Sequence, residues 1–245
     1  MGCLFDLEFL LEERADEKYR EFSSSLVPNC GTMLGVRLPQ LRSLAKRLVQ
    51  ENEYSAISRR LLDSSIFEER MVCGMCLGYS AKTFSEIIPR LRRFIRRIDN
   101  WSICDSFCAS LKIAGRSQNK LSDFILPYFD SKREFDVRFA YVMELMYLSS
   151  NRKYLSYAFK TFDRPVIDKF YARMGAAWAL SKFCALYPRE ITDFMERCRL
   201  DHESFSMAVR KICDCRTLDL KTKVRVREIM RGRIPPGAKI LKSAR

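Results

Sequence analysis

Residues that interrupt helices are scarce in this chain, which has only nine glycines and eight prolines among its 245 residues. The alternating pattern typical of β-strands is also missing, whereas apolar residues recur with helical spacing from about residue 16 to residue 230. Because glycine and proline are the residues least compatible with a helix interior, their scarcity favours long helices. We therefore predict an all-α fold.

Long apolar runs are absent as well. No segment reaches the roughly 18 uncharged apolar residues that a membrane-spanning helix requires. The first residues, MGCLFDLEFLLEERADEK, turn acidic at once and lack the basic start of a secretory signal. We therefore expect an intracellular, cytoplasmic protein with no membrane partner, whose ten cysteines stay reduced.

Histidine is nearly absent, because His202 is the only one, and this weighs against a structural zinc site. CGMC at residues 73–76 has the spacing of a zinc or redox pair, but CDC at residues 213–215 is a poor second half for such a site. The alternative is that CGMC packs in the core, since it lies inside the helical stretch FEERMVCGMCLGYS. The core interpretation is favoured, and we expect neither a metal nor a cofactor.

Negative charge is in the minority. Lys and Arg total 44 against 30 Asp and Glu, which gives a formal net charge of +14. Such an excess favours a polyanion, chiefly nucleic acid, although a solvated charged surface produces the same composition. Arg90, Arg93 and Arg97 are spaced to share one helix face, which suits contacts with phosphates. Arg37 comes just before Pro39 at a predicted helix start, where it either contacts phosphate or simply lies on the surface beside a capped helix.

Helical segments that begin with an aromatic residue recur along the chain at intervals of 34, 34, 36 and 34 residues. They begin at Phe67, Trp101, Phe135, Tyr171 and Phe205. A more polar helical segment follows each of the first four. This pattern is typical of an α-solenoid, a superhelix of helical-pair repeats in which each pair covers the apolar face of the next. We predict one such domain over residues 1–232 and a basic, flexible tail over residues 233–245.

One residue of DNWSICDSFC, residues 99–108, does not fit this alignment. Asp105 occupies the fifth position of its segment, where the other four segments carry nonpolar residues. A carboxylate at a buried position is costly unless it is paired or functional. Arg138 lies one repeat later at nearly the same angular position, and Trp101 and Trp178 are the only tryptophans. These residues indicate either a buried ion pair covered by core tryptophans or a functional site.

Four strings, GVRLPQLRSLAK, FEERMVCGMCLGY, DNWSICDSF and YARMGAAWALSKFCALYP, together resemble the AlkD-like DNA alkylation repair family. The resemblance covers about residues 5–230, and its most specific element is DNWSICDSF, which is close to the family's Asp-x-Trp-x-x-x-Asp helix start. It implies an α-solenoid of HEAT-like repeats with a concave basic groove, in agreement with the period described above. It also implies a DNA repair protein that binds alkylated double-stranded DNA, and we expect it to be a monomer.

The same resemblance implies roles for individual residues. Trp101 and Trp178 match the two aromatic residues that contact the sugar of the lesion nucleotide. Asp105 matches the catalytic carboxylate, and Arg138 matches the arginine that approaches the DNA backbone. The implied activity is that of a DNA glycosylase, a hydrolase that removes cationic N3- or N7-alkylpurines without base flipping. The residues predicted to bind DNA are Arg37, Arg90, Arg93, Arg97, Lys182 and Lys211.

The chain departs from the family pattern at one position. Active members that resemble this family carry an arginine three residues after the second tryptophan, where this chain has Ser181 followed by Lys182. This departure keeps open a non-catalytic solenoid that binds bent, branched or damaged duplex DNA. A protein-interaction scaffold is a further alternative, because helical solenoids often serve that purpose. A basic concave face favours DNA as the partner.

Overall fold

The computed structural model describes residues 2–27, 30–51 and 54–233, and these residues form fourteen α-helices and three short 3-10 helices. No β-strand occurs in these described ranges, where an isolated bridge joins Thr32 to Ile66. The predicted all-α class is therefore confirmed. The elements are α1 (Gly2–Glu12), α2 (Glu17–Leu26), α3 (Leu38–Gln50), α4 (Tyr54–Leu62), α5 (Phe67–Tyr79), α6 (Phe84–Ile95), α7 (Trp101–Ser110), η1 (Lys112–Arg116), α8 (Gln118–Ile125), η2 (Leu126–Asp130), α9 (Glu134–Tyr147), η3 (Arg152–Tyr154), α10 (Leu155–Phe162), α11 (Phe170–Leu186), α12 (Pro188–Met195), α13 (His202–Asp214) and α14 (Leu220–Gly232).

The helices gather into two compact units, Met1–Leu148 and Ser149–Arg245. The sequence prediction was a single domain over residues 1–232. The spacing of the aromatic-led segments carries no mark of the division, because the interval across it is 36 residues and the other intervals are 34. Each unit is described below by itself.

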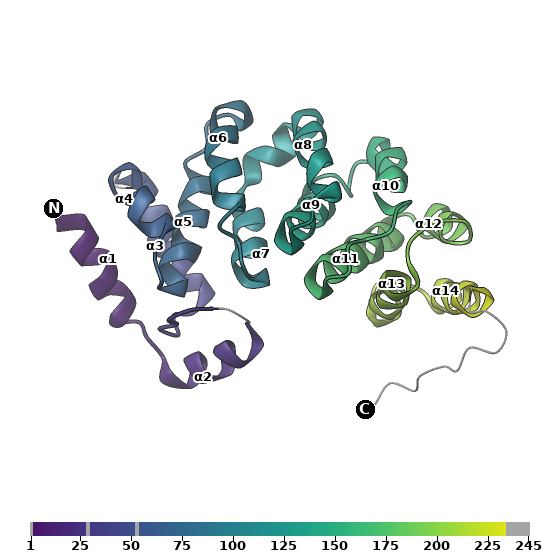
Figure 1. Cartoon of the computed structure of the whole chain (residues 1–245), viewed down its shortest axis with the longest axis horizontal. Helices are drawn as coiled ribbons and strands as arrows, with labels where there is room; N and C mark the ends of the chain where they lie inside the picture. Colours follow the sequence, from purple (N-terminus) through teal and green to yellow (C-terminus); the bar gives the residue numbers. More distant parts are fainter. Residues whose placement is uncertain (1, 28–29, 52–53, 234–245) are drawn as a thin grey trace. The chain divides into compact units, whose positions relative to one another are not determined.

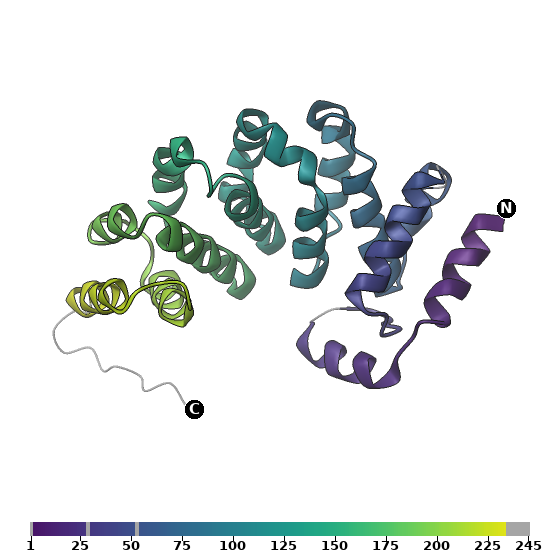
Figure 2. The ribbon, with the colours of Figure 1, turned by 180° about the vertical axis from the view of Figure 1, so that it is seen from behind.

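The first unit is built in two layers. In one layer, α3, α5, α7 and α9 pack against one another in chain order. In the other layer, α4 and α6 pack on α5, and α8 packs on α6 and α9. Both views of the ribbon show α4, α6 and α8 along one edge of this unit (Figures 1 and 2). Because successive repeats stack side by side, each apolar helix face is covered by the next pair.

The second unit repeats this arrangement with fewer helices. α11 and α13 pack against each other along their lengths, and α12 and α14 lie against them and against each other. The extensive α11–α13 contact is possible because α11 is rich in alanine and glycine on its buried side. Small side chains allow two helix backbones to approach closely.

The five aromatic-led segments of the sequence correspond to α5, α7, α9, α11 and α13. The polar segments between them correspond to α6, α8, α10 and α12. The helical-pair repeat is thus present within each unit. At the fifth position of the alignment, four of the five residues are buried, as a core position requires. Asp105 is the exception, because its side chain is partly exposed.

The CGMC cysteines lie in the core, which confirms the interpretation favoured from the sequence. Cys73 and Cys76 are both buried on α5. Burial raises the pKa of the Cys73 thiol to about 12 and raises the pKa of the Cys76 thiol still further. A thiol that stays protonated at neutral pH is a poor metal ligand and a poor nucleophile. Within the described ranges, no group of three or more His, Cys, Asp or Glu residues is arranged to hold a metal ion.

The C-terminal boundary differs from the prediction by one residue. Arg233 was assigned to the flexible tail, but its guanidinium donates hydrogen bonds to the carbonyl oxygens of Met195, Cys198 and Leu200, at 3.1, 2.9 and 3.1 Å. It also lies 4.3 Å from the centre of the Phe205 ring. Arg233 therefore fastens the end of α14 to the second unit. The rest of the predicted tail lies outside the described residues. Among the described helices, none has the length and apolar character needed to cross a membrane.

Candidate active site

The N-terminus of α7 places Trp101 and Asp105 on one helix face. Asn100 caps the helix, because its side-chain oxygen accepts a hydrogen bond of 3.0 Å from the backbone N–H of Ile103. The amide of Asn100 is buried and donates in turn to the Asp99 carboxylate at 2.8 Å. With the helix start fixed, Trp101 is its first residue and Asp105 follows one turn later.

Asp105 and Arg138 form a two-pronged ion pair between α7 and α9. Nε of Arg138 donates to one carboxylate oxygen of Asp105 at 2.9 Å, and Nη2 donates to the other oxygen at 2.7 Å. The Arg138 side chain is only 6% exposed, whereas the Asp105 side chain is 18% exposed. The ion pair that the sequence offered as one alternative is therefore present, and Asp105 also keeps an accessible edge.

Burial and pairing act on the Asp105 carboxylate in opposite directions. Burial raises its pKa, while the hydrogen bonds and the positive charge of Arg138 lower it, and the net pKa lies above the usual value for an aspartate. Arg138 stays protonated, because a guanidinium does not lose its proton in proteins. The result is a carboxylate of fixed orientation whose proton affinity is higher than that of a surface aspartate.

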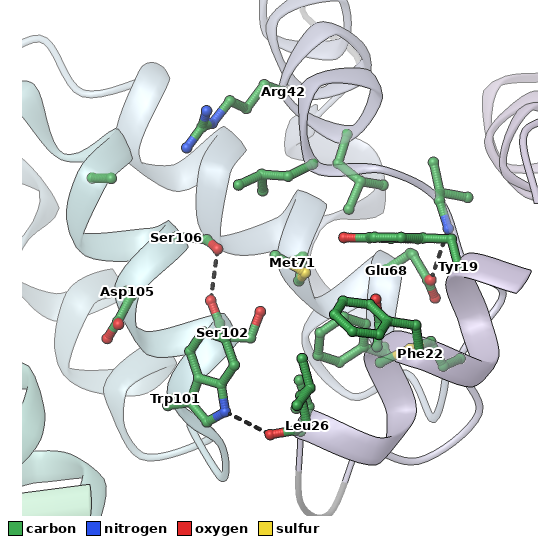
Figure 3. Close-up of a pocket in the computed structure, with 18 of the residues that line it drawn as sticks. Tyr19, Phe22, Leu26, Arg42, Glu68, Met71, Trp101, Ser102, Asp105 and Ser106 are labelled. Atoms are coloured by element: carbon green, nitrogen blue, oxygen red, sulfur yellow. Dashed lines mark hydrogen bonds between the residues drawn. The ribbon is translucent and has the colours of Figure 1, made fainter. Parts of the chain in front are cut away.

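The Trp101 indole is held by the end of α2. Its Nε1–H donates a hydrogen bond of 3.1 Å to the carbonyl oxygen of Leu26, and the side chain remains partly exposed. Leu26 is the last residue of α2, where helix carbonyls have no partner within the helix. The two residues are 75 positions apart in sequence (Figure 3). The bond fixes the plane of the indole one helical turn from Asp105.

A cavity of about 420 Å³ lies in the first unit between α2 and the helices that carry the repeat. Its wall is largely apolar and includes Tyr19, Phe22 and Leu26 of α2 opposite residues of α7 (Figure 3). Asp105 lies at its edge, next to the hydroxyls of Ser102 and Ser106. The carboxylate is thus the anionic group at the border of an apolar hollow. The residues lining the cavity are Tyr19, Phe22, Ser23, Leu26, Val27, Met33, Val36, Leu38, Leu41, Arg42, Phe67, Glu68, Met71, Trp101, Ser102, Asp105, Ser106, Ala109 and Met146.

Glu68 shapes one end of this cavity. It is buried in the first turn of α5, and its carboxylate accepts hydrogen bonds from the backbone N–H groups of Leu34, Gly35 and Val36, between 2.7 and 3.2 Å. Three backbone donors compensate the cost of burying the charge. Glu68 therefore serves to fold the segment before α3, and its hydrogen-bonding capacity is already used for structure.

Trp178 belongs to the second unit and is not a core residue. Its side chain is 37% exposed, although the residues on both sides of it in α11 are buried. The interpretation of both tryptophans as core residues is therefore wrong for Trp178. A large exposed aromatic on an otherwise buried helix is a typical feature of a binding surface. Lys182 follows four residues later, on the same exposed face of α11.

The sequence was then compared with known families. The family model described as DNA alkylation repair enzyme matches residues 7–212, which is most of the chain and includes Trp101, Asp105, Arg138 and Trp178. The chain belongs to this family. Membership places it in DNA repair and implies that it binds DNA. A comparison with curated proteins found no match.

Arg37 of this DNA alkylation repair protein has a structural partner. It precedes the first residue of α3, and its guanidinium pairs with Asp16 at 2.8 Å and lies 4.7 Å from the centre of the Tyr19 ring. Its backbone N–H donates to the side chain of Gln40. The side chain is still 58% exposed. Arg37 thus joins α2 to α3, next to the cavity that borders Asp105.

The predicted arginine cluster lies in the other layer of the first unit. Arg90 and Arg93 are on α6 and line a separate groove between α4 and α6. Arg97 does not share their helix, because α6 ends at Ile95, and it pairs with Asp63 at 2.7 Å. The structure therefore does not bring these three arginines to Asp105. The predicted helix face exists only for Arg90 and Arg93.

The two predicted lysines are exposed residues of the second unit. Lys182 lies on α11 and Lys211 on α13, the two helices that pack against each other. Neither forms an ion pair with a carboxylate among the described residues. Both are therefore available to an anionic ligand. Ser181, which stands where active relatives of this kind carry an arginine, is buried and does not replace that side chain.

Sequence reasoning missed the contribution of α2 and Arg42. Tyr19, Phe22 and Leu26 carry the weak signal of apolar residues at helical spacing, but α2 precedes the first repeat used in the alignment. Arg42 lies on the exposed side of α3, and Figure 3 shows its guanidinium on the Ser106 side of the cavity. It forms no ion pair with a carboxylate of the described residues. Arg42 is thus the unpaired cation closest in this arrangement to the Asp105 cavity wall.

Proposed function

We propose that this protein is a DNA glycosylase that hydrolyses the N-glycosidic bond of cationic N3- or N7-alkylpurines in duplex DNA. The observation that carries the proposal is the Asp105 carboxylate, fixed at both oxygens by Arg138 and accessible at the edge of a cavity beside Trp101. Membership of a family of DNA alkylation repair enzymes supplies the substrate class.

The chemistry required of the protein is limited, because an N3- or N7-alkylpurine already carries positive charge. When the bond between C1′ and the purine nitrogen breaks, its electron pair neutralises the base, and positive charge develops on the sugar. Water then adds to C1′ and loses a proton, which leaves an abasic site and the free alkylated base. A fixed carboxylate stabilises a developing cation more effectively than mobile water does. Asp105 is the catalytic residue in this scheme.

Arg138 acts through Asp105 as a positioning residue. Its two hydrogen bonds prevent the carboxylate from rotating, and its charge keeps the carboxylate ionised despite burial. Trp101 contributes a ring face that attracts a sugar with positive charge. Trp178 carries the corresponding role through the family resemblance, and its exposure supports that role. Arg42 provides an unpaired guanidinium for a phosphate near the cavity.

The test is release of 7-methylguanine and 3-methyladenine from methylated duplex DNA, measured by chromatography with the full chain in excess. Wild type is expected to release base above the spontaneous rate. Asp105→Asn is expected to lower release by about 100-fold or more, since the anionic stabilisation is lost. Asp136→Asn is the matched control, because Asp136 is a buried acid of α9 that bonds to Ser131 and does not line the cavity.

Loss of folding must be separated from loss of chemistry, since Asp105→Asn leaves Arg138 buried without its counter-charge. The double variant Asp105→Asn with Arg138→Met removes both charges and relieves that cost. We expect it to melt cooperatively and to bind DNA while remaining inactive. Wild type without release above the spontaneous rate would overturn the proposal, and so would full activity of Asp105→Asn.

A second candidate function is DNA binding without base release. The specific observation in its favour is Ser181, which is buried in α11 and offers no guanidinium where active relatives carry one. In that case, duplex DNA would bind in a salt-dependent way and Asp105→Asn would leave its affinity unchanged. The base-release assay separates the two candidates directly.

A further inference from the structure

A second groove of about 420 Å³ lies in the first unit, between α4 and α6. Three arginines line it, Arg59 from α4 and Arg90 and Arg93 from α6, and we call it the arginine groove. Its floor includes Cys73 and Leu77 of α5, and hydroxyl-bearing residues of α4 lie along its wall. The proposed glycosylase chemistry makes no use of this groove.

The three arginines carry uncompensated charge. Arg59, Arg90 and Arg93 are all exposed, and none forms an ion pair with a carboxylate in the part of the chain that the structure describes. Asp63, at the end of α4, is already paired with Arg97. Arg90 and Arg93 are three residues apart on α6, so their side chains start about 5–6 Å from each other. Guanidinium groups gathered without counter-charge around a groove form an attractive site for phosphate oxygens.

The arginine groove and the Asp105 cavity lie against opposite faces of α5. Phe67 and Met71 face the cavity, whereas Cys73 and Leu77 face the groove. Met71 and Cys73 are two residues apart, which corresponds to about 200° around a helix. A duplex that contacts the cavity side therefore leaves the groove side of the same helix open.

We propose that the arginine groove is a second DNA-binding site, which takes the phosphate backbone of a separate duplex segment while the first segment lies at the Asp105 face. This inference depends on the DNA binding that family membership implies, and it does not depend on base release. A protein with two such faces bridges neighbouring duplexes and passes between them without full dissociation. A second duplex is present at high effective concentration for any protein already bound to long DNA.

Two other classes of partner fit the groove less well. A membrane surface requires exposed large apolar residues next to the basic ones, and none occurs among the described residues of α4 and α6. An acidic peptide offers carboxylates, but the chain's net charge of +14 and its family favour a polyanion of DNA type. We therefore commit to duplex DNA and treat the acidic peptide as an outcome of the test.

The experiment uses two short unmethylated duplexes and the full chain. The first duplex is fixed to beads and loaded with protein, the unbound protein is washed away, and a second, fluorescent duplex is then offered. Wild type is expected to capture the second duplex. The triple variant Arg59→Gln, Arg90→Gln and Arg93→Gln is expected to capture about tenfold less of it, with a salt dependence shallower by about three units of slope. The amount of protein on the beads is expected to change little, because none of the three arginines lines the Asp105 cavity.

The matched control removes the same charge elsewhere, with Lys82→Gln, Arg189→Gln and Arg197→Gln, all at exposed positions outside the arginine groove. Retained capture by the control supports the site. Equal loss in both triple variants would overturn the proposal, because net charge alone would then explain capture. Two chains per pair of duplexes, or loss of polyglutamate binding without loss of duplex capture, would also overturn it. Base release from a short methylated duplex is measured in parallel, so that failure of the glycosylase proposal is seen separately.

Discussion

The Asp105 carboxylate has an orientation that a surface acid lacks, because both of its oxygens accept hydrogen bonds from one buried guanidinium. An ion pair of this kind contributes little net stability, since the cost of removing both charges from water offsets much of their attraction. Local rules of burial are therefore broken at the fifth position of α7 without an evident structural gain. Such conflicts are expected at functional sites, where stability is given up for a defined arrangement of charge.

The pH dependence of base release tests the role of Arg138. Only the ionised form of Asp105 stabilises a cationic sugar, so activity is lost as the pH falls through its pKa. Because that pKa is raised in the folded protein, the acid limb is expected above the usual 3.8 of an aspartate. Arg138→Lys replaces two directed hydrogen bonds by one mobile donor and is expected to shift the limb to higher pH. The measurement is a pH–rate profile of single-turnover base release, corrected for spontaneous depurination.

Arg70→Lys is the matched control for that profile. Arg70 on α5 pairs with Asp99 at 2.5 Å, in the same manner as an arginine–aspartate pair between neighbouring segments, but it does not line the Asp105 cavity. Its substitution is expected to leave the acid limb where it is. An identical shift in both variants, or an unchanged limb in Arg138→Lys, would contradict the assignment of Arg138 as the residue that sets the ionisation of Asp105.

Single residues differ in how well the sequence reveals them. Asp105 and Arg138 were predicted together, because the repeat alignment gives each a register and a carboxylate at a buried register is conspicuous. The partner of Trp101 was not predictable, since it is the backbone carbonyl of Leu26, 75 residues earlier. A backbone acceptor has no side-chain signature, and only the folded position of α2 brings it near.

At the scale of elements, the repeat helices were predictable and α2 was not. Helices α5 to α13 have a recurring aromatic start and a regular spacing, which fix their number and their pairing. α2 has no buried residue at all, and it is held by the Asp16–Arg37 pair, by the backbone around Gly35 and by the indole of Trp101. A helix that buries none of its residues fully leaves little periodic signal for the sequence to display.

Gly35→Ala tests whether the attachment of α2 positions Trp101. Gly35 has a φ of +90°, and an added Cβ would collide with the backbone oxygen of Asp16 and with Arg20. Such a conformation costs an L-residue about 1–2 kcal/mol before any collision is counted. We expect faster hydrogen exchange in α2 and a red shift in Trp101 fluorescence, measured in a Trp178→Phe background in which Trp101 is the only tryptophan.

Gly232→Ala is the control for this substitution, because nothing lies within 4 Å of a Cβ added there. It lies at the end of α14, in the second unit, and is expected to leave both α2 exchange and Trp101 emission unchanged. Normal exchange of α2 in Gly35→Ala would show that the turn at Gly35 does not hold the helix. In that case the Asp16–Arg37 pair and the Trp101 hydrogen bond would be sufficient.

At the scale of the whole molecule, composition predicted the partner better than the pattern of arginines predicted the surface. The net charge of +14 agrees with a family that acts on DNA. The expected contacts through Arg90, Arg93 and Arg97 were assigned by helical spacing, which gives the face of a helix but not the layer to which the helix belongs. Because α6 is in the layer opposite to α7, those arginines do not surround Asp105.

Trp178→Ala tests whether the second unit contributes to the activity proposed for Asp105 in the first. Its side chain is largely on the surface, so the free energy of unfolding is expected to change by less than about 1 kcal/mol. If its ring attracts the cationic sugar, base release falls by about 2- to 30-fold, the range that corresponds to the energy of a cation–π contact. Leu186→Ala, another exposed apolar residue of α11, is expected to leave base release unchanged, and both variants are compared by thermal unfolding and by single-turnover release. Equal activity of Trp178→Ala and wild type would confine the active site to the first unit.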